Sequence, residues 1–155
     1  FVLELMGWRG LLVDNMQESV DRARRYRINP IVQCDVTQVD WGELLIDAKT
    51  PSIIDYISMD TDAANTALVK RFPFDRYQFK VMTFEHDRYQ GSDERKKACE
   101  EALASYPQYV KLLDSAKVDG KEWEDWWVNR DFISAEILKF ASSGMEWKDF
   151  LTKLS

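Results

Sequence analysis

Short apolar runs alternate with stretches of helical spacing along most of the chain. The run at residues 54–59 is too short for a lone helix and fits a strand covered on both faces. Similar strand-like runs occupy residues 10–14, 30–36 and 79–84. Helical spacing is found at residues 16–26, 41–47 and 64–72. This alternation predicts an α/β fold with a doubly wound, mostly parallel sheet and helices on both faces.

The second half of the chain adds two further patterns. The β-prone runs at residues 109–113 and 125–128 flank a turn at residues 119–120, which predicts an antiparallel hairpin at one sheet edge. Apolar residues then recur at helical spacing in residues 132–141 and 147–154, which predicts two short amphipathic helices. These helices are expected to close over the sheet, or to dock on another copy or on a partner protein.

Composition narrows the class of protein. A length of 155 residues and a hydrophobic share of 45% are typical of a globular protein with a real core. A net charge of -6 without a long basic run argues against nucleic-acid binding. No apolar run has the length of a membrane span, so we expect a cytoplasmic protein without membrane contact. Cys34 and Cys99 belong to no paired motif, which predicts reduced core thiols and makes a zinc site improbable.

Acidic residues follow the two strongest strand patterns. Asp60 and Asp62 come after the run at residues 54–59, and Glu85, His86 and Asp87 come after the run at residues 79–84. Ligands bind at the carboxyl ends of strands in open α/β sheets, so both groups are candidates for a site. The lone histidine can take a proton from a substrate hydroxyl near neutral pH. A structural role for His86 carries equal weight.

Two further acids end the earlier strand patterns. Asp14 is placed to accept hydrogen bonds from the ribose hydroxyls of a nucleotide, and capping of the following helix is an equally weighted alternative. Asp35 is placed to reach an exocyclic adenine amine, although the role of a turn residue is slightly favoured for it.

Three sequence blocks together resemble a known family. GWRGLLVD, IDYISMDTD and FPFDRYQFKVMTFEHD occur in the order and at roughly the spacing of the FkbM-type methyltransferase domain. The resemblance implies an O-methyltransferase that uses S-adenosylmethionine and has a Rossmann-like sheet. It covers residues 1–128, expected to form the methyltransferase-type domain, and leaves residues 129–155 as a helical tail. The acceptor would be a hydroxyl of a sugar or of a natural-product-like molecule.

The resemblance also implies roles for the acidic residues. Asp14, Asp35 and Asp60 match positions that bind the cofactor. Asp60 or His86 would act as the base, with Glu85 as a further catalytic residue that shapes the pocket. Asp62 and Asp87 would contact the substrate. A divalent metal between Asp60, Glu85 and Asp87 is chemically allowed, because carboxylates are hard oxygen ligands, but it is the minority alternative.

The chain departs from the family pattern in two respects. The first strand and the Gly-rich cofactor loop are expected to precede Phe1. The Gly and the later Glu that the family has after the acids are Ala63 and Asn65 here. These departures keep a second hypothesis open, in which the domain is catalytically inactive and serves binding or assembly through its tail helices, in contact with another copy or a partner protein.

Overall fold

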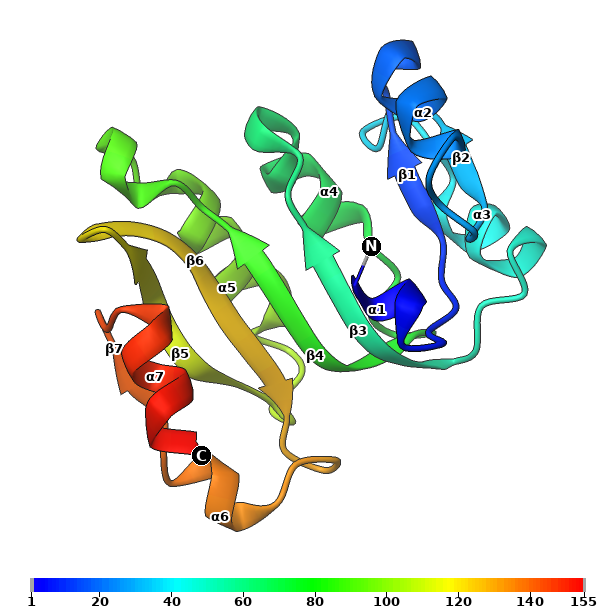
Figure 1. Ribbon diagram of the computed structural model, residues 1–155. Helices are drawn as coiled ribbons and strands as arrows, with labels where there is room; N and C mark the ends of the chain where they lie inside the picture. The colour runs from blue at the N-terminus through cyan, green and yellow to red at the C-terminus, as the bar shows by residue number, and fades with distance from the viewer. Residues whose placement is uncertain (1, 155) are drawn as a thin grey trace. The chain divides into compact units, whose positions relative to one another are not determined.

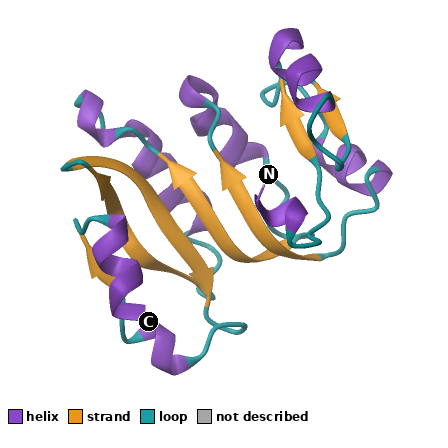
Figure 2. Ribbon diagram, in the orientation of Figure 1, coloured by secondary structure: helices purple, strands orange, loops and turns teal. Residues whose placement is uncertain are grey.

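The computed structural model describes residues 2–154, and its strands and helices confirm the α/β class (Figures 1 and 2). The chain divides into two compact units, residues 1–50 and 51–155. The predicted domain boundary after residue 128 stays a prediction, and the tail belongs to the second unit. The strands form two sheets, one of two strands and one of five.

The first unit is a small βαβ arrangement followed by a helix. Its elements are, in chain order, α1 (Val2–Leu5), β1 (Leu12–Asp14), α2 (Gln17–Arg24), β2 (Ile31–Gln33) and α3 (Trp41–Asp47). Strands β1 and β2 pair in parallel. Gly7 follows α1 with a φ of 86°, which a residue without a Cβ adopts readily.

The second unit contains the five-stranded sheet. Its elements are β3 (Ile53–Met59), η1 (Asp62–Ala64), α4 (Asn65–Arg71), β4 (Gln78–Glu85), η2 (Arg88–Gln90), α5 (Glu94–Leu103), β5 (Tyr109–Val118), β6 (Lys121–Asn129), α6 (Ala135–Leu138), β7 (Ser142–Ser143) and α7 (Trp147–Leu154). The strand order is β3-β4-β6-β5-β7. The β3/β4 and β5/β7 pairs are parallel, whereas β6 is antiparallel to both of its neighbours. The sheet is therefore mixed rather than mostly parallel.

The predicted hairpin is formed by β5 and β6. Asp119 and Gly120 connect these strands with φ values of 51° and 76°, the left-handed pair that a type I′ turn requires. The hairpin does not form the outer edge of the sheet, because β6 also pairs with β4 and β5 also pairs with β7.

Helices cover both faces of this sheet, as predicted. Neighbouring residues of a strand point to opposite faces. Asp125 of β6 lies 3.4 Å from Lys96 of α5, whereas the ring of the next residue, Trp126, meets Phe150 of α7 edge to face. Helix α7 accordingly lies in front of the sheet in Figure 1, and α5 lies behind it.

The tail packs on the sheet of its own chain. Phe150 is fully buried against Leu112, Leu113 and Val128. Burial of one phenylalanine side chain stabilises a fold by about 1.5–3 kcal/mol. The prediction of a helix at residues 147–154 is confirmed. The prediction of a helix over residues 132–141 is wrong in extent, since α6 has four residues and begins after the Ser134 cap.

Two other expectations concern the whole chain. None of the helices among residues 2–154 is both long enough and apolar enough to cross a bilayer. Cys34 and Cys99 are both free thiols, and Cys99 is fully buried. Burial raises the pKa of the Cys99 thiol well above its usual value.

Candidate functional site

The acidic strand ends of β3 and β4 lie side by side. The two strands are parallel, and Met59 at the end of β3 is paired with Phe84 near the end of β4. Asp60 and Glu85, each one residue further on, therefore occupy the same edge of the sheet. The sequence pattern predicted this convergence, and the register accounts for it, because parallel strands in register end together.

Asn65 ties the two strand ends together. Its side chain is fully buried at the start of α4. The amide nitrogen donates to the carbonyl oxygens of Glu85 at 2.8 Å and of Met59 at 3.3 Å. The amide oxygen accepts from the backbone N–H and the hydroxyl of Thr61 at 2.9 and 2.7 Å. A glutamate, which the family pattern has here, could not donate these bonds, so Asn65 is a positioning residue in this chain.

Glu85 holds its proton more tightly than an ordinary glutamate. Burial of its carboxyl group raises the pKa to about 8, and the neighbouring carboxyls of Asp60, Asp87 and Asp62 add to the shift. Carboxylates close together cannot all ionise without a compensating cation. At neutral pH the strand ends therefore hold a proton between Glu85 and its neighbours, which is the property of an acid or base poised near physiological pH.

We expect Glu85→Gln to stabilise the fold at pH 8 by up to about 1 kcal/mol in buffer without divalent cations, a small effect because solvent screens a partly exposed carboxylate. The folded-state pKa of about 8 lies above the ordinary value of 4.5, so wild-type stability falls as the pH rises between these values. Glutamine cannot ionise and lacks this loss. Urea denaturation at pH 5 and pH 8 measures the difference, with the exposed Glu101→Gln as control. An equal stability difference at both pH values would contradict the prediction.

His86 lies on the same turn but is directed into the protein. The residue is 2% exposed. Its Nδ1 accepts from the backbone N–H of Arg88 at 3.2 Å, so the proton of the neutral ring is on Nε2. Nε2 lies 3.3 Å from Oδ1 of Asp125, without the alignment of a hydrogen bond. Both ring nitrogens thus face protein groups, and the role of His86 as a base stays a prediction.

A cleft of about 690 Å³ opens beside these strand ends. It lies between α4, the β4 end and the start of α5, and all of its lining comes from the second unit: Ala63, Thr66, Ala67, Lys70, His86, Asp87, Gln90, Ser92, Glu94 and Arg95. Arg95 donates to Oδ2 of Asp87 at 2.7 Å. The cleft therefore offers acidic and basic groups together.

The first unit places its two predicted cofactor residues at turns. Oδ1 of Asp14 accepts from the backbone N–H of Met16 at 2.8 Å in a turn ahead of α2. The N-cap residue of α2 is Met16 and no side chain caps it, so Asp14 does not have the helix-capping role weighed for it. Oδ1 of Asp35 accepts from both the N–H and the hydroxyl of Thr37, and these bonds lower the pKa of Asp35. Asp35 thus has the turn geometry that the sequence favoured, and both cofactor roles stay predictions.

A buried ionic cluster lies behind His86 on the α5 face of the sheet. Asp125 is fully buried, accepts from the N–H of Ser115 at 2.8 Å and lies 3.0 Å from Nζ of Lys111. Lys96 bridges Asp125 and Asp114. Sequence reasoning missed Asp125 and Arg95. The sequence feature that could have identified Asp125 is its position as an acidic residue among tryptophans in a β-prone run. No local sequence feature identifies Arg95.

The fold and the site define an α/β protein with an acidic cluster at the carboxyl ends of two parallel strands, beside a cleft that has both acidic and basic side chains. Comparison of the chain with protein-family models, curated proteins and solved structures gave no match. The functional argument therefore depends on the residues themselves.

Proposed function

We propose that the protein is an S-adenosylmethionine-dependent O-methyltransferase of the FkbM type, which methylates a hydroxyl of a sugar or natural-product-like acceptor. The observation that carries this proposal is the convergence of Asp60, Asp62, Glu85 and Asp87 at the ends of β3 and β4. The sequence blocks that contain these acids are those that resemble the family. By the resemblance, Glu85 and Asp87 match positions on the substrate side of the cleft, and Asp60 matches a position that binds the cofactor.

A Rossmann-like arrangement is part of the proposal. Each unit contains a strand, a helix and a second strand parallel to the first, namely β1-α2-β2 and β3-α4-β4. This βαβ unit is the repeat from which doubly wound sheets are built. In both units the first strand ends at or just before an acid, Asp14 or Asp60, where nucleotide-binding sheets carry ligand contacts.

The proposed roles combine the resemblance with the geometry of the strand ends. When bound, S-adenosylmethionine supplies an electrophilic methyl group on a sulfonium centre. Asp14 uses only Oδ1 in the hydrogen bonds of the described residues, so its Oδ2 is free to accept from a ribose hydroxyl. Asp60 accepts the proton of the acceptor hydroxyl, and Asp62 and Asp87 orient the acceptor. Orientation supplies most of the rate enhancement in such a displacement.

Calorimetric titration of the complete protein with S-adenosylmethionine tests this function. We expect saturable binding with a Kd on the order of 10 µM, a common affinity for an enzyme ligand. Asp14→Asn should weaken binding about tenfold or more, because one charged hydrogen bond to the ribose is lost. Asparagine retains an oxygen for the N–H of Met16, so the start of α2 is preserved.

The matched control is Asp47→Asn, which removes the same charge from an exposed position in the same unit. Its affinity should equal that of the wild type. Absence of heat with a well-folded complete protein would overturn the methyltransferase proposal and favour a non-enzymatic binding or assembly role. Equal affinities of the two variants would remove Asp14 from the proposed cofactor site.

A further inference from the structure

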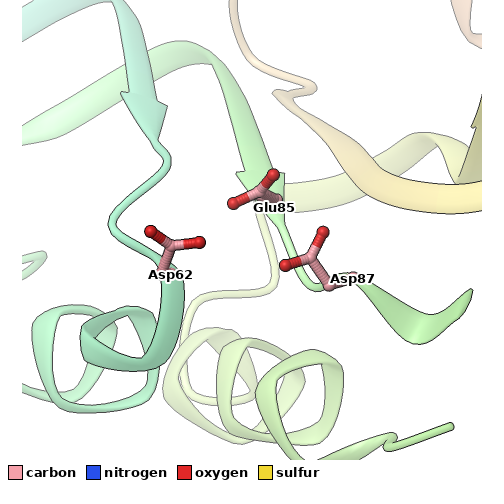
Figure 3. A group of neighbouring side chains, drawn as sticks. All are labelled: Asp62, Glu85 and Asp87. Carbon is pink, nitrogen blue, oxygen red and sulfur yellow. The ribbon is translucent and has the colours of Figure 1, made fainter. Parts of the chain in front are cut away.

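Three carboxylates at the strand ends enclose a common point. One oxygen from each of Asp62, Glu85 and Asp87 lies within 4.8 Å of the others. Figure 3 shows the three groups directed toward one another from η1, the end of β4 and the turn after it. Oxygens bound at about 2.1–2.5 Å to one cation lie no more than about 4–5 Å apart. The spacing of the cluster is therefore that of a single coordination sphere.

An unpartnered oxygen points to the same conclusion independently. Asp87 is 4% exposed, and its Oδ2 accepts from Arg95 and Gln90. Its Oδ1 is buried and, within residues 2–154, has no hydrogen-bond donor; the same holds for Oε2 of Glu85. A buried carboxylate oxygen without a donor destabilises a fold by about 1–3 kcal/mol or more. A cation bound by this oxygen would remove that penalty.

Charge and ligand type define the kind of ion. Arg95 is the one basic side chain that forms an ion pair with the three carboxylates among the described residues, so the cluster retains excess negative charge. Its donors are carboxylate oxygens alone, since His86 is directed at Asp125 and Arg88 instead. Oxygen-only sites select hard divalent cations such as Mg²⁺, Mn²⁺ and Ca²⁺ over zinc or copper.

We propose that Asp62, Glu85 and Asp87 bind one hard divalent cation, with Oδ1 of Asp87 as the buried ligand. Asp87 also lines the 690 Å³ cleft, as does Ala63, the neighbour of Asp62. Coordination positions not filled by the three carboxylates are thus available to an oxygen ligand in the cleft. If the protein is the proposed methyltransferase, the oxygen ligand in the cleft is the hydroxyl of the acceptor. The cation would make the proton of this hydroxyl more acidic.

Titration of the complete protein with Mn²⁺, followed by the electron paramagnetic resonance signal of the free ion, tests the site. No S-adenosylmethionine is added, so the result is independent of the proposed methyl transfer. We expect one site per chain with a Kd on the order of 100 µM, within the range of weak carboxylate sites. Mg²⁺ should compete for it. Asp62→Asn and Glu85→Gln should each weaken Mn²⁺ binding at least tenfold.

The backbone supplies a matched control. Asp62 and Asp119 are both exposed and have the same left-handed φ of 51°, a conformation that asparagine tolerates. Asp119→Asn removes the same charge from the β5–β6 turn and should leave the affinity unchanged. Absence of a stoichiometric site, or equal losses for Asp62→Asn and Asp119→Asn, would overturn the proposal. If the protein binds the metal but has no affinity for S-adenosylmethionine, the cation site stands and the methyltransferase proposal is overturned.

Discussion

Asp125→Asn is expected to lower the free energy of unfolding by about 3–5 kcal/mol at pH 7, the range found when one member of a buried ion pair is removed. The side chain is fully buried and lies 3.0 Å from Lys111 and 3.4 Å from Lys96. Asparagine has nearly the same shape and can still accept from the N–H of Ser115. It leaves two lysines, which are only 17% and 12% exposed, without their central counter-charge.

The loss should depend on pH. Burial alone would raise the pKa of Asp125, but the contact with His86, the N–H of Ser115 and the charges of Lys111 and Lys96 outweigh burial and hold the pKa well below its usual value. A depressed carboxyl pKa contributes stability above the unfolded-state value of about 3.9, and this stability is lost as the pH falls toward the folded-state pKa. The difference between wild type and variant should therefore shrink below about pH 4.

Urea denaturation followed by tryptophan fluorescence at pH 7 and at pH 3 measures both effects. Asp149→Asn is the control, because it makes the same change at an exposed position of α7. A loss below about 1 kcal/mol at pH 7 would mean that the cluster contributes no more than a surface pair. A difference that does not change with pH would show that packing, rather than charge, holds Asp125 in place.

Asn65→Asp is expected to lower the free energy of unfolding by about 3 kcal/mol, although it replaces one nitrogen by one oxygen. The new oxygen would face the carbonyl oxygens of Glu85 and Met59, to which the amide now donates. An ionised carboxylate there would also be buried beside the acids of the neighbouring strand ends. Both effects leave acceptors without donors in a buried place.

The same denaturation measurement tests this variant. Asn15→Asp serves as the control, because Asn15 is exposed and its side chain forms no hydrogen bond within the described residues. It should alter stability by less than about 0.5 kcal/mol. Equal effects of the two variants would mean that the amide of Asn65 does not hold the ends of β3 and β4 together.

Local patterns in the sequence predicted the elements of the fold well. Helix α3 matches its predicted bounds, and the hairpin forms because Asp119 and Gly120 tolerate left-handed backbone. The helix predicted over residues 132–141 was too long, because the apolar spacing there also fits a short helix followed by the two-residue strand β7. Hydrophobic periodicity indicates which residues will be buried, but it does not determine the type or length of the secondary-structure element that contains them.

The position of the candidate site could be predicted from the sequence, but the hydrogen bonds and ion pairs of its residues could not. The acids at the ends of two strand patterns were recognisable because parallel strands end at one edge. The buried contacts of Asn65 and Asp125 join residues far apart in the chain, such as Asn65 with Glu85 and Ser115 with Asp125. No local signal encodes such pairs. His86, which stood out as the lone histidine, has one such distant contact, with Asp125, and one local contact, with the N–H of Arg88.

The position of Phe150 has a practical consequence for work with this protein. Its ring closes one face of the sheet, although it lies close to the last described residues of the chain. Truncation of the chain before α7 would expose Leu112, Leu113 and Val128 to solvent and promote aggregation. Purification handles are therefore better attached beyond α7 than substituted for it.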